Sequence, residues 1–192
     1  VGTSGGGVYS GRFDNDYSIE WHDSTGPYPE IYNIQIKVDP TNSNIIYATS
    51  YPGGVFKSTD QGANWVEANF AMPSFEVEDP KLQGYYSLEI DPNNPDILYL
   101  GIFSKGVYKS YDGAGTWIPM YGNMGQNAYI MEKEITKVKV DPSNSDHVYL
   151  ATSDSGVYFS DDGAESWEEM NDGLQTLDIK SLKVANIEYN DF

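Results

Sequence analysis

The sequence predicts an all-β fold in which four-stranded antiparallel sheets form the blades of a β-propeller. Short apolar segments recur with a period of about 50 residues, and turn-forming residues separate them. Each period holds four such segments. Four short antiparallel strands per repeat at this spacing are typical of a propeller. No segment has helical periodicity of useful length, so we expect no helices.

An eight-residue pattern, here called the Ser-x-Asp octad, marks each of three repeats. It begins with Ser, has Asp two residues later and a turn with Gly or Ala, and ends with Trp. The Asp carboxylate can accept N–H bonds inside the turn, Gly permits unusual backbone angles, and Trp covers the hairpin. We therefore assign the octads a structural role, closing the hairpin between the third and fourth strands. The residues are Ser58, Asp60, Gly62 and Trp65; Ser110, Asp112, Gly113 and Trp117; and Ser160, Asp162, Gly163 and Trp167, with the Ser positions 52 and 50 residues apart.

The four strands of each repeat can be justified in order. The first alternates polar and apolar residues, so one face is buried, and it ends at Asp-Pro, which forms a turn. The second is nearly all apolar and is expected to be buried on both faces. The third carries Gly-Val-aromatic, and the fourth begins at the Trp. The first strands are expected at 34–38, 87–90 and 136–140, before Asp39, Asp91 and Asp141; the second at 45–48, 97–100 and 148–151; and the third at 54–56, 106–108 and 156–158.

The repeats divide the chain into a partial blade (1–30), three full blades (31–83, 84–133 and 134–178) and a first strand (179–192). Residues 1–9 match the end of a second strand followed by a third, and 179–184 match a first strand. We expect a segment of a larger wheel of roughly six to eight blades, completed by a missing segment. Closure of a four-bladed ring within one chain, and of an eight-bladed ring with a second copy, are the alternatives.

Composition limits the partners and the compartment. The chain has 192 residues, 39% hydrophobic, and a net charge of −18, which repels nucleic acid and anionic lipid. No apolar run approaches the roughly 20 residues that span a bilayer. There is no cysteine, so disulfides and thiolate sites are excluded. We expect an extracellular or cell-surface protein without a cofactor or a metal site.

The octads resemble the Asp-box, also called the bacterial neuraminidase repeat. The surrounding pattern is similar to three groups of propellers: xyloglucan-active glycoside hydrolases, sortilin-type receptors and photosystem II assembly-factor-like proteins. The resemblance covers nearly the whole chain and implies a sialidase-like propeller fold. Ala114 and Ala164 depart from it, because they stand where the usual box has a second Gly, and a degraded copy runs from Ser10 to Trp21.

The resemblance also identifies a candidate catalytic residue. Sialidases bind the substrate carboxylate with three arginines, whereas this chain has Arg12 alone, so it is not a complete sialidase. In the xyloglucan-active hydrolases a catalytic Asp lies in the turn between the second and third strands, and Asp154 in 152–156 matches that position. The other repeats have no acid there. Catalysis would need a second carboxylate roughly 5 to 10 Å away, and the alternative is that Asp154 is a solvated turn residue.

The long connections between repeats are the expected binding surface, since a rigid wheel positions such loops. Aromatic residues beside acids and amides suit stacking on a sugar ring or gripping a peptide, although they also suit packing of the loops onto the wheel. Our first hypothesis is a non-catalytic module that binds glycan or polypeptide, or acts as an assembly scaffold. The alternatives are part of a glycoside hydrolase acting on β-glucan or xyloglucan, and a photosystem-type assembly factor. The candidate ligand-binding residues are Tyr28, Tyr32, Phe75, Tyr85, Tyr86, Tyr121 and Tyr129.

Overall fold

The computed structural model describes residues 2–3, 7–13, 18–24, 32–51, 53–72, 86–102, 105–121, 130 and 132–185. These residues form fifteen strands in four antiparallel sheets, here called blades 1 to 4. Blade 1 holds β1 (Gly2–Thr3), β2 (Gly7–Phe13) and β3 (Ile19–Asp23); blade 2 holds β4 (Tyr32–Val38), β5 (Ile46–Tyr51), β6 (Gly54–Ser58) and β7 (Val66–Glu67). Blade 3 holds β8 (Tyr86–Ile90), β9 (Leu98–Ile102), β10 (Gly106–Ser110) and β11 (Ile118–Met120); blade 4 holds β12 (Ile135–Asp141), β13 (Asn144–Thr152), β14 (Val157–Ser160) and β15 (Glu168–Glu169).

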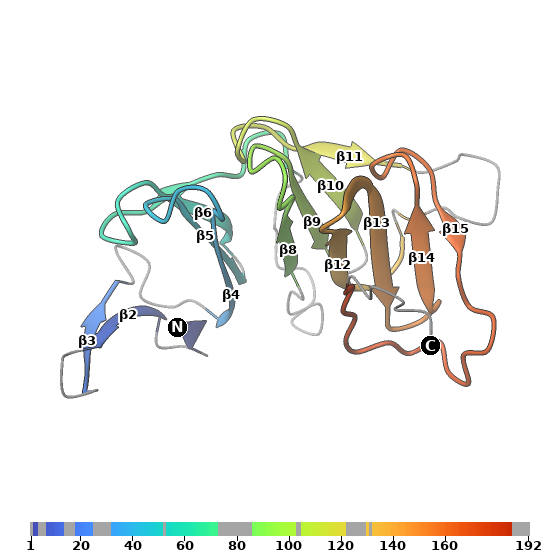
Figure 1. Cartoon of the computed structure of the whole chain (residues 1–192), viewed down its shortest axis with the longest axis horizontal. Coiled ribbons are helices and arrows are strands. Elements are labelled where there is room, and N and C mark those ends of the chain that lie inside the picture. Colours follow the sequence, from blue (N-terminus) through green and yellow to red (C-terminus); the bar gives the residue numbers. More distant parts are fainter. Residues whose placement is uncertain are drawn as a thin grey trace, which may run out of the picture.

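The predicted all-β propeller fold is confirmed. Each blade is an antiparallel meander in which consecutive strands pair, and the blades follow one another along an open arc with blades 1 and 4 at its ends (Figure 1). The first strands of neighbouring blades contact each other, β4 with β8 and β8 with β12. The described part of the chain contains no helix, and so none long and apolar enough to cross a membrane.

Most of the predicted strands are present, and one is not. The first strands lie within β4, β8 and β12, and each fourth strand begins directly after its Trp. Blade 1 has three strands, corresponding to the second, third and fourth strands of the other blades. Residues 179–184, predicted as a first strand, form no ladder. A first strand is stabilised by pairing with the second strand of its own blade, and the described residues include no strand after β15. Ile179 instead donates its N–H to the carbonyl of Thr152, the last residue of β13, at 2.8 Å.

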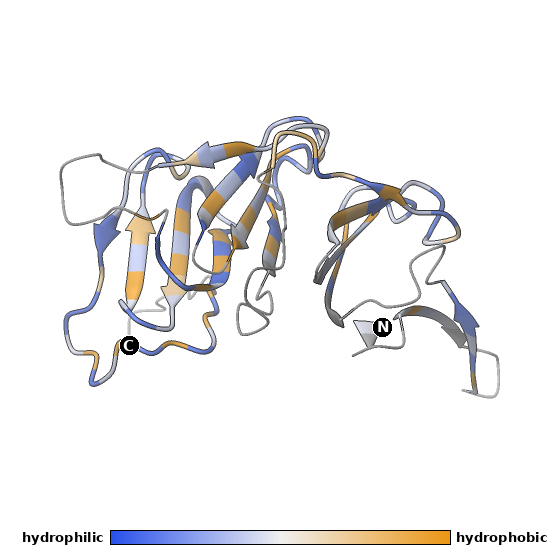
Figure 2. Ribbon diagram, turned by 180° about the vertical axis from the view of Figure 1, so that it is seen from behind, coloured by the Kyte–Doolittle hydropathy of each residue, from blue (hydrophilic) through white to orange (hydrophobic). Residues whose placement is uncertain are grey.

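The apolar core lies between the blades rather than within one sheet. Apolar bands follow the strands, whereas the connecting turns are mostly hydrophilic (Figure 2). Val55 of blade 2 packs into one cluster with Leu88 and Trp117 of blade 3, and Val107 of blade 3 packs with Val138 of blade 4. The sheets therefore stabilise each other by apolar burial face to face.

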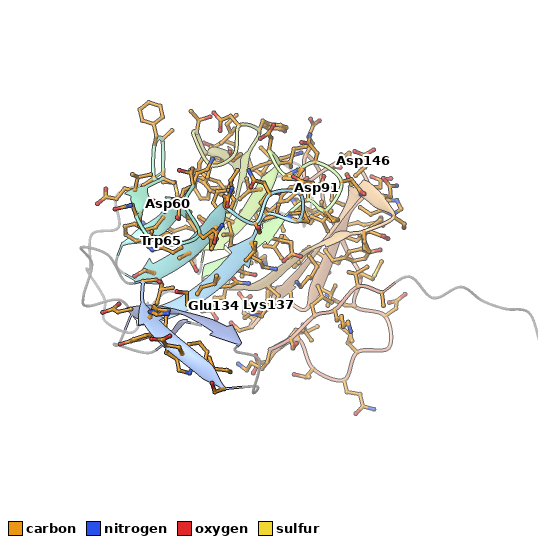
Figure 3. All side chains as sticks on the ribbon, turned by 60° about the vertical axis from the view of Figure 1, so that its left-hand side comes forward. Asp60, Trp65, Asp91, Glu134, Lys137 and Asp146 are labelled. Atoms are coloured by element: carbon orange, nitrogen blue, oxygen red, sulfur yellow. The ribbon has the colours of Figure 1, made fainter. Side chains whose placement is uncertain are left out.

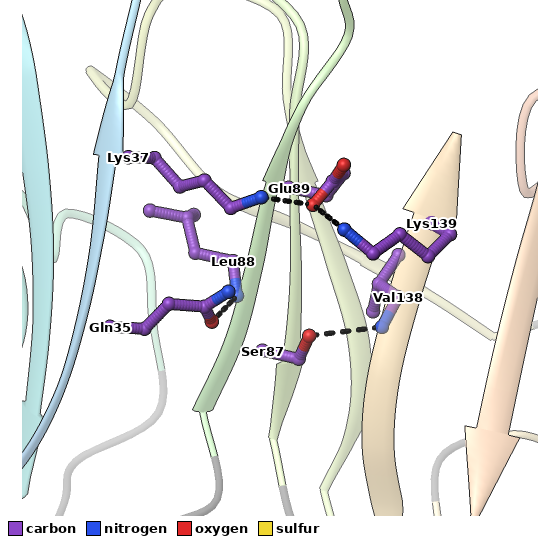
Figure 4. Close-up of polar contacts among 7 residues, drawn as sticks. All are labelled: Gln35, Lys37, Ser87, Leu88, Glu89, Val138 and Lys139. Carbon is purple, nitrogen blue, oxygen red and sulfur yellow. Dashed lines mark hydrogen bonds and ion pairs between the residues drawn. The ribbon is translucent and has the colours of Figure 1, made fainter. Parts of the chain in front are cut away.

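The first strands are also joined by a charged bridge. Glu89 of β8 accepts hydrogen bonds from Lys37 of β4 at 2.5 Å and from Lys139 of β12 at 2.9 Å (Figure 4). The three side chains are less than one third exposed. Desolvation lowers the pKa of Lys37 despite the carboxylate beside it. Glu89 therefore balances two lysines from the two neighbouring blades.

Backbone amides of the first strands are bonded across the same interfaces. Gln35 Oε1 accepts the N–H of Leu88 at 2.8 Å, and Ser87 Oγ accepts the N–H of Val138 at 3.0 Å (Figure 4). Each bond joins one blade to the next. The polar residues of the alternating strands thus hold the register between blades.

A Lys–Gly contact joins the outer parts of the blades. Lys57 Nζ of blade 2 donates to Gly113 O in the octad of blade 3 at 2.8 Å. Lys109 Nζ of blade 3 donates in the same way to Gly163 O in blade 4, also at 2.8 Å. Gly113 and Gly163 have φ values of 66° and 70°, which glycine adopts without strain. The octad of one blade is therefore held by a lysine of the blade before it.

Candidate functional site

The turn between β13 and β14 carries Asp154, and the start of the first strand lies beside it. Asp154 is exposed to solvent. The N–H of Ser153 donates to Glu134 O at 3.0 Å, and its hydroxyl donates to the Glu134 carboxylate. Lys133 Nζ donates to Ser155 Oγ at 3.0 Å. The turn that presents Asp154 is thus clamped from one side by the dipeptide that precedes β12.

A second clamp comes from the segment after β15. Asn171 Oδ1 accepts the N–H of Val157 at 2.8 Å, and its Nδ2 donates to Ser155 O at 3.1 Å. The N–H of Gly156 donates to Leu177 O at 2.9 Å. Gly156 has a φ of 84°, and a Cβ there would lie 2.0 Å from Asn171 Oδ1, so only glycine fits. The turn is therefore fixed on both sides while the Asp154 carboxylate faces water.

The Asn clamp occurs in two of the three full blades. Asn69 of blade 2 accepts the N–H of Val55 at 2.8 Å and donates to Gly53 O at 2.9 Å. Tyr121 stands at the corresponding position of blade 3, directly after β11, and a phenol cannot make the same pair of bonds. The Asn-clamped turn between second and third strands therefore occurs in blades 2 and 4, and of these two turns the one in blade 4 carries an acid.

Glu134 supplies a second carboxylate close to Asp154. Ser153 contacts Glu134 and directly precedes Asp154. The Glu134 carboxylate therefore lies beside the turn that carries Asp154. A glycoside hydrolase would need the two carboxylates to be roughly 5 to 9.5 Å apart. The sequence signal for Glu134 was an acid immediately before an alternating first strand, and we did not single it out as the partner of Asp154.

Glu134 lies at the opposite end of the sheets from the octads and the Asp-Pro turns. Figure 3 shows Glu134 well separated from Asp60, Asp91 and Asp146. Successive strands of a blade are antiparallel. The starts of the first strands and the turns between second and third strands therefore lie at the same end of the sheets. We call this the Asp154 end. The other end carries the octads.

Most of the predicted ligand-binding aromatics cannot be placed. Tyr28, Phe75, Tyr85 and Tyr129 lie outside the described residues. Tyr32 and Tyr86 are the first residues of β4 and β8, so their backbones lie at the Asp154 end, at the same level as the start of β12. Tyr121 is exposed and lines a hollow of about 330 Å³ together with Pro119, Met120, Ala164 and Glu165.

The octads form compact polar turns. Ser58 Oγ donates to Asp60 Oδ1 at 2.8 Å and accepts the N–H of Gly62 at 2.8 Å. The side-chain amide of Asn64, together with its backbone N–H, holds the pKa of Asp60 below its usual range. The other two octads repeat the Ser–Asp bond, at 2.9 Å and 2.7 Å. All the hydrogen bonds described for these Ser and Asp side chains lie within the turn.

The Trp side chains of the octads pack against the preceding blade. Trp65 Nε1 donates to Ser24 O at 2.7 Å and Trp117 Nε1 donates to Ala68 O at 2.8 Å. Trp167 is equally buried, yet its Nε1 has no partner in the structure. By position, the acceptor that corresponds to Ser24 O and Ala68 O is the carbonyl of Met120 in blade 3.

The described residues include no group of three His, Cys, Asp or Glu side chains that could hold a metal ion. What the Asp154 end offers is a fixed turn with the exposed carboxylate of Asp154, beside the partly exposed Glu134 and Ser155. Such groups hydrogen bond to the hydroxyls of a sugar, or act as acid and base if the separation fits.

No family model matches the chain. Over 101 residues it is 29% identical to the xyloglucanase Xgh74A of Acetivibrio thermocellus, a match that covers 43% of this chain and 12% of that enzyme. Among solved structures, the GH74 enzyme of Niastella koreensis superposes with a TM-score of 0.59 at 25% identity, covering 86% of this chain and 27% of that one. An ancestral GH74 enzyme superposes with a TM-score of 0.55 at 20% identity, covering 70% of this chain and 18% of that one, and shows the shared fold alone.

These similarities describe a propeller segment. The chain is a set of β-propeller blades similar to those of xyloglucan hydrolases, and it spans a small part of the length of each relative.

Proposed function

We propose that the chain is part of an extracellular propeller that binds a β-glucan of the xyloglucan class at the Asp154 end. The observation that carries the proposal is the turn at 153–155, which two clamps fix while the Asp154 carboxylate faces solvent. A rigid polar site loses little conformational entropy when it binds a ligand. The similarity to a protein named xyloglucanase supports this glycan class.

The aromatic residues at the same end fit this function. Tyr32 and Tyr86 begin the first strands of blades 2 and 3, at the level where Glu134 precedes the first strand of blade 4. Aromatic rings beside acids bind sugars by stacking and hydrogen bonding. A glycan lying across the starts of the first strands would meet both kinds of residue.

We also propose that the octads are Asp-box repeats with a structural role, and that the blades correspond to residues 1–30, 31–83, 84–133 and 134–178. In this proposal 179–192 begins the next blade of a wheel of roughly six to eight blades. The polar bonds inside the octads support the structural role, because they leave the Ser and Asp side chains engaged.

Binding is tested by affinity electrophoresis in gels containing xyloglucan, with mixed-linkage β-glucan and starch as comparison polymers. We expect retardation by xyloglucan, which Asp154→Asn and Glu134→Gln weaken. The matched control is Asp161→Asn, an exposed acid of the same blade at the octad end, which should migrate as the wild type. Equal migration in all gels contradicts the proposal. Weaker retardation of Asp161→Asn would place the binding site at the octad end instead.

A second candidate function is hydrolysis of the same glycan. It is favoured by one observation, the Glu134 carboxylate brought next to the Asp154 turn. Release of reducing ends from xyloglucan should then fall by roughly 10²-fold or more in Asp154→Asn, as for loss of a general acid or base. Activity unaffected by that change removes Asp154 as a catalytic residue, and retardation without activity leaves a binding module. The polypeptide-binding, scaffold and photosystem-type hypotheses stay predictions.

A further inference from the structure

The hollow beside Tyr121 lies at the junction of two consecutive blades, blades 3 and 4. One wall is the outermost strand of blade 3, β11, together with the residue that follows it, and the other wall is the octad of blade 4. In Figure 1, β11 lies at the edge of blade 3 and points toward the turn between β14 and β15, which is that octad. The hollow has a volume of about 330 Å³, and its lining residues are Pro119, Met120, Tyr121, Ala164 and Glu165.

The lining residues differ from their counterparts at the junction of blades 2 and 3. Alignment of the octads shows which positions correspond. Of the five lining residues, only Ala164 has the same side chain as its counterpart, Ala114. Positions that depart from an otherwise repeated pattern are where a role other than folding is expected. The counterparts of Pro119, Met120, Tyr121 and Glu165 are Glu67, Ala68, Asn69 and Gly115.

Tyr121 stands where blades 2 and 4 have the Asn that clamps the turn between second and third strands. Asn69 and Asn171 each make two hydrogen bonds to that turn. In blade 3 an aromatic residue replaces this structural amide, and it is 52% exposed. Its ring therefore offers an accessible face beside Met120, which packs against blade 4.

Glu165 is presented by a fixed backbone. The N–H of Ala164 donates to Ser160 Oγ at 2.8 Å, and the N–H of Ser166 donates to Asp162 Oδ1 at 2.8 Å. The N–H of Glu165 also donates to the Asp162 carboxylate. The Glu165 side chain itself is exposed. The octad thus holds a hydrogen-bond acceptor at the edge of the hollow.

An unpaired indole lies at the same junction. Trp167 packs in one apolar cluster with Ala164, and Met120 packs against that cluster. Trp167 is 4% exposed and its Nε1 has no partner in the structure, whereas Trp65 and Trp117 each donate to a carbonyl of the preceding blade. Buried donors are rarely left unpaired. The junction that carries the hollow is therefore also the one that lacks the indole bond between blades.

The lining argues against two kinds of ligand. An extended polypeptide would have to pair with the free edge of β11, but this strand has three residues and its central residue, Pro119, has no N–H. An anionic ligand would be repelled by the net charge of −18. Glu165 is the one charged residue among the five that line the hollow, which suits a neutral ligand.

A sugar ring matches what remains. A pyranose has an apolar face of C–H groups, which stacks on an aromatic ring such as Tyr121 and packs on Pro119 and Met120. Its hydroxyls lie at the edge of the ring, where one can donate to the Glu165 carboxylate. The volume of the hollow is at the lower end of the roughly 300 to 1,000 Å³ found for small-molecule sites.

We propose that this hollow binds one pyranose ring of a neutral glycan, with Tyr121 as the stacking platform and Glu165 as the acceptor for a hydroxyl. The hollow is formed in part by the octad of blade 4, so it is separate from the Asp154 end and does not depend on binding there. Two such sites on one chain would raise the apparent affinity for a polymer above that for a short oligosaccharide.

The first test uses methionine methyl signals in NMR spectra of the whole chain labelled with methyl-¹³C Met. Met120 lines the hollow, whereas Met170 directly precedes Asn171, which clamps the Asp154 turn. Met120→Leu and Met170→Leu assign the two signals. On titration with a xyloglucan oligosaccharide we expect the Met120 signal to shift with saturation. A shift of Met170 scores the Asp154 end separately, and an unmoved Met120 signal overturns the proposal whatever Met170 does.

Variants test the two named roles. Tyr121→Ser and Glu165→Gln should each weaken the binding measured at Met120 roughly tenfold or more, whereas Tyr121→Phe keeps the ring and should bind nearly as the wild type does. The matched controls are Phe70→Ser, an exposed aromatic residue outside the hollow, and Asp161→Asn, an exposed acid of the same octad. Both controls should leave binding unchanged.

Three results would refute the assignment. They are unchanged binding in both Tyr121→Ser and Glu165→Gln, equal losses in the control variants, and a Met120 shift caused by a lysine-rich peptide but not by the oligosaccharide. The last result would assign the hollow to a cationic polypeptide instead. Circular dichroism shows that each variant is folded.

Discussion

The unpaired indole of Trp167 allows one hydrogen bond between blades to be measured against a matched control. Trp117 and Trp167 are 1% and 4% exposed and occupy the same place in consecutive blades. Trp117 Nε1 donates to Ala68 O at 2.8 Å, whereas Trp167 Nε1 has no partner in the structure. Changing each to Phe removes a similar apolar volume. The difference between the two variants therefore reports the hydrogen bond.

The magnitude follows from what each change leaves behind. Trp117→Phe leaves the buried carbonyl of Ala68 without its donor, which costs roughly 1–3 kcal/mol beyond the lost packing. Trp167→Phe removes an unpaired donor and has no such cost. We expect Trp117→Phe to be the less stable variant by about 2 kcal/mol, or roughly 4–8 °C in Tm for a chain of this size. Thermal and urea unfolding followed by circular dichroism measure this, and equal losses, or a larger loss for Trp167→Phe, would refute the reasoning.

Three further changes test other parts of the account. Glu89→Gln leaves two partly buried lysines without their carboxylate and should lower the free energy of unfolding by roughly 2–4 kcal/mol, measured in urea; a loss below about 0.5 kcal/mol would show that the bridge is solvent-screened. The N–H of Thr116 is the main group that holds the pKa of Asp112 below its usual range. The contribution of the Asp112 carboxylate to stability is therefore complete above about pH 4 and is lost as the pH falls through the lowered pKa. Asp112→Asn should therefore be less stable at pH 7 and lose less on acidification, and parallel pH profiles would contradict this. Gly156→Ala should weaken glycan retardation and stability strongly, whereas Gly173→Ala, with the same φ of 84° and open space around it, should cost about 1 kcal/mol; equal effects would argue against the clamp.

Repetition made most of the fold predictable from the sequence. Alternation, Asp-Pro and Gly-Val-aromatic are local signals, and each recurs in several blades, so an error in one copy is corrected by the others. The strand expected at 179–184 has the same local pattern but no ladder in the structure. Local pattern decides which segments are able to form strands, whereas pairing depends on a neighbour that the segment itself does not encode.

The site was less predictable because its parts are far apart in sequence. Asp154 was found from its position in a turn, but the Glu134 contact joins residues separated by a whole strand pair. The bridge of Glu89 to Lys37 and Lys139 crosses three blades. Alternation shows that such residues face one side of a strand, and does not show which residues of other blades they meet. The predicted aromatics Tyr28, Phe75, Tyr85 and Tyr129 lie outside the described residues.

Hydrogen exchange with and without a xyloglucan oligosaccharide tests most directly whether the Asp154 end is the binding face. Our account predicts added protection in peptides that contain 133–134 and 152–156, and none in the octads 58–65, 110–117 and 160–167. Protection confined to the octads, or no change anywhere in the chain, would contradict it.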